Sequence, residues 1–296
     1  MLGSIYALIA LGYTMVYGVL RLINFAHGDV YMMGAFIGLF TARLMHPSAD
    51  PLSAIPVTGV QLFLIVLVAM IGSAALGVLI ERVAYRPLRK APRLTALITA
   101  IGISMLLEYG GQIWFGATPR PYPQLIGGAG QMAVNTASGI TISKVDLIIL
   151  AVALVLVLIL QLIVYRTKPG KAMRAVSFDR EAASLMGINT DTIIVLTFII
   201  GSAFAGVAGV LVGMRNQSIE PLMGLTAGLK AFVAAVIGGI GSIQGAALGG
   251  LVMGLSEEMV RAVYPQLTDA VVFGLLILIL VLRPTGLLGG ATTEKV

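Results

Sequence analysis

Apolar residues occupy most of this chain in long runs, and short polar stretches separate the runs. A helix needs ~20 apolar residues to cross the ~30 Å hydrocarbon core of a bilayer. The pattern therefore predicts an all-α polytopic membrane protein with about eight to nine transmembrane helices, some of them short or broken. All of them are expected in a single domain, 1–296. The predicted runs are 1–20, 30–45, 59–80, 94–115, 145–165, 192–214, 226–240, 243–260 and 270–289.

Composition strengthens this prediction and excludes several functions. Hydrophobic residues make up 58% of the chain and charged residues 11%, against about 25% charged in soluble domains. The chain has no cysteine, which excludes disulfides, thiolate metal sites and cysteine nucleophiles, and its two histidines are too few for a histidine-rich metal site. Because it also lacks a nucleotide-binding motif, we expect no catalytic residue, metal or cofactor. The first residues are apolar and lack the basic region of a secretory signal, so 1–20 is expected to be the first span.

Three runs are too short to cross a bilayer alone. These are 30–45, 226–240 and 243–260, and each adjoins a polar or glycine-rich break. Irregular backbone survives at membrane depth only beside protein or water, which makes such breaks typical of a transport path. The last two runs could also form one hairpin that turns within the membrane.

Basic residues cluster in two short loops that together hold ten of the 19 lysines and arginines. The positive-inside rule places both loops in the cytoplasm and the N-terminus outside. The high net charge, +6, is therefore a signal of orientation rather than of nucleic-acid binding. The clustered residues are Arg82, Arg86, Arg89, Lys90 and Arg93 in one loop, and Arg166, Lys168, Lys171, Arg174 and Arg180 in the other.

Many glycines lie inside the apolar runs at a spacing of four, which lets helices approach closely. We expect these glycines to serve packing. The pairs are Gly34 with Gly38, Gly209 with Gly213, Gly245 with Gly249 and Gly250 with Gly254.

The second basic loop contains the signals of a short helix at 178–186. Pro169 and Gly170 are expected to end the preceding helix, and Ser177 to cap the new one. Acidic residues in the first turn favour a helix start, and Gly187 is typical of a left-handed C-cap.

An apolar stripe runs along this predicted helix, formed by Phe178, Ala182, Leu185 and Met186. Because so short a helix is marginal alone in water, something must hold it. It could rest on the protein's own cytoplasmic face or on lipid headgroups, or it could dock in a cleft of a soluble partner.

A polar break at 21–31 interrupts the first two runs. Arg21 and Asp29 fit either an interfacial turn or a water-lined path, because burying such charges in a bilayer is costly. Asn24 and His27 favour the path.

Other polar residues could belong to the same path. Glu108 and Gln112 share one helix face, and Gln244 lies in the glycine-rich break 239–245, which lacks the Lys-Ser/Thr of a phosphate loop. The candidate path residues are thus Asn24, His27, Asp29, Glu108, Gln112 and Gln244.

Four further charges are interpreted as structural. Glu257 and Glu258 with Arg261 are expected to form a local ion pair at a solvated helix end. Lys230 is expected to extend toward the headgroups.

Several segments resemble a known family. Glu181-Ala182-Ala183 followed by Gly187 resembles the "EAA…G" loop of bacterial ABC importer permeases. The segment "ALIALGYTMVYGVLRLINFAHGDVYMMGA" closely resembles the LivH-type branched-chain amino acid permease family. Supporting segments are "ERVAYRPLR", "LITAIGIS", "GLKAFVAAVIGGIGSIQGAALGG" and "LRPTGLLG".

The resemblance implies a coupling helix that sits in a groove of an ATP-hydrolysing subunit. It also implies a second homologous permease subunit, two cytoplasmic ATP-binding subunits and a periplasmic substrate-binding protein, all acting in a bacterial inner membrane. The substrate would be leucine, isoleucine or valine. The residues implied for coupling are Arg174, Phe178, Asp179, Glu181, Ala182, Leu185 and Gly187.

Three alternatives remain beside this function. Related permeases carry urea or short amides. An ion-coupled carrier would need a relay for which only Glu108 and Asp29 are candidates. An intramembrane enzyme lacks a pair of catalytic groups at membrane depth.

Overall fold

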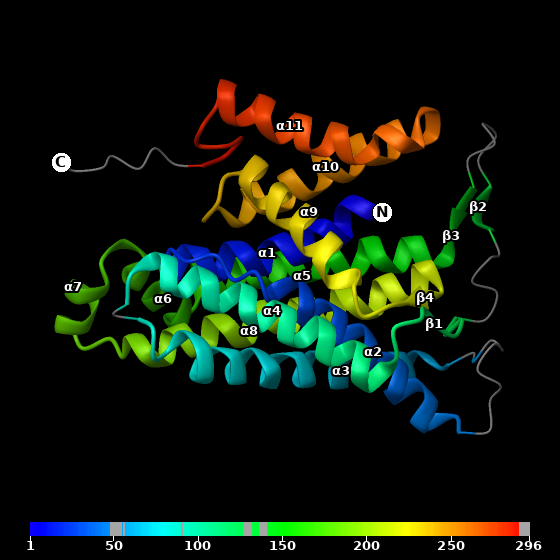
Figure 1. Cartoon of the computed structure of the whole chain (residues 1–296), viewed down its shortest axis with the longest axis horizontal. Coiled ribbons are helices and arrows are strands. Elements are labelled where there is room, and N and C mark those ends of the chain that lie inside the picture. Colours follow the sequence, from blue (N-terminus) through cyan, green and yellow to red (C-terminus); the bar gives the residue numbers. More distant parts are fainter. Residues whose placement is uncertain (48–54, 56, 90, 127–131, 136–140, 290–296) are drawn as a thin grey trace.

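The computed structural model describes residues 1–47, 55, 57–89, 91–126, 132–135 and 141–289 (Figure 1). Lys90 of the first basic loop lies outside these residues. The elements are α1 Leu2–Leu20, α2 His27–Met45, α3 Gly59–Ile80 with a π-helical turn Glu81–Tyr85, α4 Arg93–Phe115, α5 Lys144–Arg166, α6 Lys168–Phe178, α7 Arg180–Leu185, α8 Thr190–Asn216, α9 Met223–Gly238, α10 Ile243–Val263, a 3₁₀ turn Pro265–Leu267 and α11 Thr268–Leu282. Two short antiparallel pairs join β1 Arg120–Pro121 to β4 Ser218–Ile219, and β2 Met132–Asn135 to β3 Thr141–Ser143.

Each apolar run predicted from the sequence is a helix, with ends shifted by a few residues for most of them and by more for α11. Within the described residues, 6 helices are long and apolar enough to cross a membrane, or up to 7 if the bent pair α9 and α10 counts as one span. The protein is therefore an all-α polytopic membrane protein.

Two helices form the centre of the bundle. In both α1 and α8, 78% of the apolar window is buried, whereas the corresponding share is 28% or less in α3, α4, α5 and α11. The outer helices carry exposed leucine, isoleucine and valine side chains, which suits contact with lipid. The core consequently lies around α1, α2, α8 and α9.

Small residues allow a close helix crossing between α1 and α10. A Cβ at Gly250 would lie 2.5 Å from the Cα of Ala7, and a Cβ at Gly254 would overlap the backbone of Gly3. These backbones can touch only because the side chains are absent. The glycines that the sequence suggested for packing lie at helix contacts, except Gly213, which lies against the Tyr122 ring of a loop.

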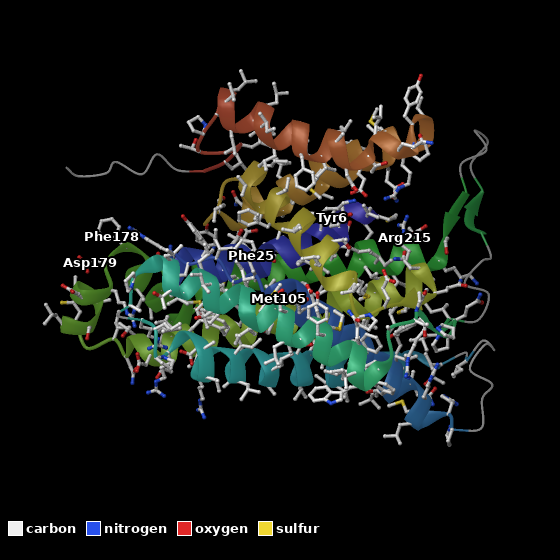
Figure 2. All side chains as sticks on the ribbon, viewed as in Figure 1. Tyr6, Phe25, Met105, Phe178, Asp179 and Arg215 are labelled. Carbon is white, nitrogen blue, oxygen red and sulfur yellow. The ribbon has the colours of Figure 1, made fainter. Side chains whose placement is uncertain are left out.

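The polar break after α1 is an extended segment that runs back into the bundle. Arg21 has a left-handed backbone with φ 53°, which turns the chain after Leu20. α2 then starts at His27, whose ring lies against Gly12 and Tyr13 in the middle of α1. Figure 2 shows Phe25, two residues before α2 begins, in the middle of the molecule's length. α2 therefore begins deep in the bundle, although it is as long as α1, with 19 residues in each.

α9 and α10 form a hairpin, which was the alternative that the sequence left open for the runs 226–240 and 243–260. Their axes bend by 119° at the break 239–242. Gly238 contacts Gly245, and Ala234 contacts Gly249, so the two helices pack side by side after the turn. Ser242 caps α10 by accepting a hydrogen bond from Gly245 N at 3.0 Å.

The described basic loops meet at one end of the bundle. Arg86 and Arg89 of the first loop and Arg180 of the second all pair with Asp191. The N-terminus and the end of α8 lie toward the opposite end (Figure 1). The arrangement agrees with cytoplasmic basic loops and an outer N-terminus.

We expect Gly250→Val to lower the thermal stability of the detergent-solubilised protein, because the new side chain would meet the α1 backbone. Overpacking of this kind costs about 1–3 kcal/mol. Gly274→Val in α11 is the matched control, since a Cβ there meets nothing within 4 Å. Equal melting temperatures for the two variants would contradict the close contact between α1 and α10 at Gly250.

Candidate functional site

The basic loop that follows α5 folds into two short helices rather than one. α6 begins after Thr167, whose Oγ1 accepts a hydrogen bond from Gly170 N at 3.2 Å. The expectation that Pro169 and Gly170 end a helix is therefore wrong. Proline fits the first turn of a helix, where its missing N–H needs no partner.

The second helix starts two residues later than predicted. Asp179, not Ser177, is its N-cap, because Asp179 Oδ1 accepts from Ala182 N at 2.9 Å. Asp179 has an extended backbone, and this separates α6 from α7. Ser177 instead donates a hydrogen bond to the carbonyl of Arg174 at 2.8 Å. The predicted helix 178–186 is thus the shorter α7.

The C-terminal end of α7 has the predicted glycine cap. Gly187 has φ +82°, a conformation that favours glycine. Ile188 N donates to Ala183 O, and Gly187 N donates to Ser184 O, both at 3.0 Å. This is a Schellman motif, which fixes where the helix ends.

α7 and its flanks expose most of their apolar side chains. Phe178 and Leu185 are each 88% exposed, and Met186 is 83% exposed. Figure 2 shows Phe178 and Asp179 at the outermost tip of this end of the molecule. Within α7 itself only Ala183 is buried. The apolar stripe is therefore not covered by the described part of the chain. We call Phe178, Leu185 and Met186 the exposed apolar tip.

The remaining residues of the predicted coupling set are also accessible. Glu181 and Ala182 are exposed, and so is Arg174. The Arg174 guanidinium lies 5.3 Å from the centre of the Tyr165 ring at the end of α5, within cation–π range. The whole set, except the capping Gly187, presents exposed side chains at this end of the bundle.

An ion network lies directly behind α7. Arg89 pairs with Glu81 at the end of α3 and with Asp191 in the first turn of α8. Glu81 is fully buried, and the Arg89 side chain is 9% exposed. The network therefore ties the α3–α4 corner to the start of α8.

Arg180 in α7 contacts the same network, with its guanidinium 4.0 Å from Asp191. Burial, together with the positive charge of Arg89, lowers the pKa of Arg180, while Asp191 opposes this shift. A cavity of about 660 Å³ opens beside these groups and is also lined by Glu181 and Ser184. A displacement of α7 would thus change the contact between Arg180 and Asp191 at the start of α8.

The candidate path residues do not form one continuous site. Asn24 accepts a hydrogen bond from Tyr85 Oη at 3.0 Å, near the cytoplasmic end. His27 is buried against α1, with its ring 4.9 Å from that of Tyr13. Arg21 is exposed and donates to Ser177 O at 3.4 Å, so for Arg21 the turn was the correct alternative.

The structure does bring Asp29 and Glu108 together. Asp29 is fully buried and accepts a hydrogen bond from Ser104 Oγ at 2.5 Å. Glu108, one turn further along α4, is close to both Ser104 and Asp29. Gln112 is half-buried on the same face, whereas Gln244 is exposed at the start of α10.

A second charged cluster contains the predicted ion pairs of Arg261 with Glu257, at 2.6 Å, and with Glu258, at 3.6 Å, but its setting differs from the prediction. Glu257 is fully buried, so it is not part of a solvated helix end. Lys230 does not extend to the headgroups, because its Nζ lies 2.9 Å from Glu257 Oε1 and 2.9 Å from Asp269 Oδ1. The sequence carried no signal for this pairing, because Lys230 lies nine residues before the break 239–242 and Glu257 fifteen residues after it.

Comparisons with known proteins agree with this architecture. A family model described as "Branched-chain amino acid transport system / permease component" matches residues 1–281. The chain is 44% identical over 295 residues to the high-affinity branched-chain amino acid transport system permease protein BraD of Pseudomonas aeruginosa, covering 99% of this chain and 94% of that protein.

Two further relatives come from Escherichia coli strain K12. The permease protein LivH of the same kind of system is 44% identical over 301 residues, which cover 100% of this chain and 94% of LivH. LivM is 26% identical over 309 residues, which cover 97% of this chain and 68% of LivM. No solved structure matches the chain.

We expect Arg89→Met to destabilise the protein strongly, because it leaves Glu81 buried without its cation. Breaking a buried pair in this way costs about 3–5 kcal/mol. Arg86→Met is the control: its side chain is 57% exposed and lies 3.5 Å from Asp191, and such pairs contribute about 0–1 kcal/mol. Thermal unfolding of the purified variants should separate them, and equal losses would refute the role of the network.

Proposed function

The chain belongs to the family of branched-chain amino acid transport system permease components, and on this premise we propose that it carries leucine, isoleucine and valine across the membrane in an ATP-driven importer. It is a multi-pass inner-membrane protein of the ABC importer permease type. The substrate proposal is supported by the names of the relatives that are 44% identical over nearly the full length.

We propose that α7 is the contact through which conformational changes driven by ATP hydrolysis are transmitted to the membrane helices. The observation that carries this is the exposed apolar tip on a capped helix at the cytoplasmic end. A water-facing patch of this kind favours a protein partner, and a helix docked in a groove is a common way to cover one. The partner would be a cytoplasmic ATP-binding subunit, one of two in the assembly.

The other proposed partners follow from the transport role. A second, related permease would complete the membrane channel, and the similarity to LivM is consistent with such relatives acting in these systems. A periplasmic binding protein would deliver substrate to the outer end. Seven residues of this loop are proposed for coupling to the ATPase. They are Arg174, Phe178, Asp179, Glu181, Ala182, Leu185 and Gly187.

A second candidate function rests on one observation, the meeting of Asp29 and Glu108 at the contact of α2 with α4. Buried carboxylates at membrane depth are typical of ion-coupled carriers. Reconstitution of this chain alone in vesicles distinguishes the two functions. Uptake driven by an ion gradient without ATPase subunits would favour the carrier, and uptake only in the complete ATP-supplied complex would favour the importer.

Leu185→Asp should abolish co-purification of the ATPase subunits with the permease, because it places a charge in the apolar contact. The variant should fold normally, since surface substitutions usually change stability by less than about 0.5 kcal/mol. Leu44→Asp is the matched control, as Leu44 is 82% exposed at the other end of α2. Retention of the ATPases by Leu185→Asp would exclude α7 as the docking helix.

Glu181→Lys and Gly187→Asp should each reduce ATP-driven leucine uptake to background while leaving membrane insertion intact. Glu181 is exposed, so its replacement changes the docking surface alone. At Gly187 any other residue is strained by about 1–2 kcal/mol and alters where α7 ends. Lys168→Glu, an exposed charge reversal in α6, should retain uptake. Normal transport by the first two variants would count against coupling through α7.

A further inference from the structure

The outer end of the bundle contains a cavity of about 420 Å³. It opens where α1 begins, α8 ends and the α9–α10 hairpin starts. Figure 2 shows Tyr6 and Arg215, both in its wall, on the opposite side of the bundle from Phe178 and Asp179. Its volume is within the ~300–1,000 Å³ of small-molecule sites. The cavity is separate from the coupling loop and from the Asp29–Glu108 contact.

Two of the cations in the cavity wall, Lys230 and Arg215, have N–H groups that no partner uses, while the third, Arg261, pairs with Glu257 and Glu258. Lys230 uses two of its three N–H groups, on Glu257 and Asp269. Arg215 bonds Asp146 at 3.1 Å and Glu258 at 3.3 Å, which uses two of its five N–H groups. Neither charge is left unbalanced, yet each can add a hydrogen bond to an incoming anion. A carboxylate is one of the anions whose planar pair of oxygens suits an arginine.

Two carboxylates in the wall of the same cavity, those of Glu257 and Glu220, have oxygen atoms available to accept further hydrogen bonds. The buried Oε2 of Glu257 has no hydrogen-bond partner in the described structure. Glu220 is exposed, and none of the ion pairs found among the described residues involves it. A buried acceptor without a partner is costly, so a cationic group entering the cavity would be stabilised there.

Apolar side chains complete the lining, among them Ile5, Val212, Met223 and Ala227. We propose that this cavity is an outer entry site for a free zwitterionic amino acid with an aliphatic side chain. Arg215 and Lys230 bind its α-carboxylate, and Glu220 with Glu257 binds its α-ammonium group. The proposal rests on the proposed transport function and assigns to the permease itself a share of substrate recognition.

The absence of cysteine from the chain makes a direct test possible. Thr226→Cys places one thiol on an exposed position of the cavity wall. The rate at which a membrane-impermeant thiol reagent modifies it, in the full chain in lipid nanodiscs, reports access to the cavity. Leucine at about ten times its dissociation constant should slow this rate about tenfold by mass action.

Two leucine analogues test whether the cavity recognises both charged groups of a zwitterionic amino acid. 4-Methylpentanoate lacks the ammonium group and 3-methylbutylamine lacks the carboxylate, so each leaves half of the charged groups unpaired. Each should need a concentration at least about tenfold higher than leucine for equal protection. Gln266→Cys, exposed in the turn before α11 and outside the cavity wall, is the control and should be modified at the same rate with or without leucine.

Three results would overturn the proposal: no modification at position 226 while position 266 reacts, no protection by leucine up to its solubility limit, or equal protection by leucine and both analogues. Leucine uptake by the complete transporter with the unsubstituted chain is measured in parallel. Uptake without protection rejects the entry site alone, whereas absence of uptake rejects the proposed substrate.

Discussion

Every backbone polar group in a bilayer must find a partner inside the protein, and this requirement governs where the chain can leave the helical conformation. The extended segment after Arg21 lies inside the bundle, where Tyr85 Oη bonds Asn24 and lies 3.4 Å from the Ile23 carbonyl. At the α9–α10 break, the N–H groups of Leu287 and Leu288 bond the last carbonyls of α9, Ile237 O and Gly238 O, at 2.9 Å. The chain after α11 thus closes the break that the hairpin opens. Both irregular segments are built parts of the fold, each covered by an element distant in sequence.

α8 connects the two ends of the molecule. Its first turn contributes Asp191 to the ion network behind α7, and its last turn contributes Arg215 to the wall of the outer cavity. The helix is 27 residues long and mostly buried between those points. Tight packing against α1, α2 and α3 makes it a stiff element. A shift of its cytoplasmic end would therefore be transmitted to the outer cavity, and this is the shortest physical link between the proposed coupling helix and the proposed entry site.

The sequence predicted the helices well because hydrophobic runs and their ends are local signals. It failed where the outcome depended on contacts between distant segments. Lys230 and Glu257 were interpreted separately, since nothing local says that α9 and α10 fold back on each other at the angle that pairs them. Pro169 was interpreted as a helix end because proline is compatible with both a helix end and a first turn, and the Thr167 cap decided between them. The candidate path residues are buried as expected of costly polar groups, except Gln112, which is half-buried, and Gln244, but burial alone does not order them into a path.

The shape of the coupling loop follows from the competition between helix continuation and capping at Asp179. Continuing one helix from Lys168 to Leu185 would keep Asp179 inside it, where its carboxylate would find no backbone N–H. By taking an extended conformation, Asp179 satisfies an N–H of α7 and leaves Phe178 as the last residue of α6. The break therefore sets the direction of α7 independently of α6, while the Gly187 cap fixes its other end. A helix of six residues gains little stability from its own hydrogen bonds. Its two caps and the Arg180 contact are what hold it in shape, and a partner that grips the exposed apolar tip would move it as one piece.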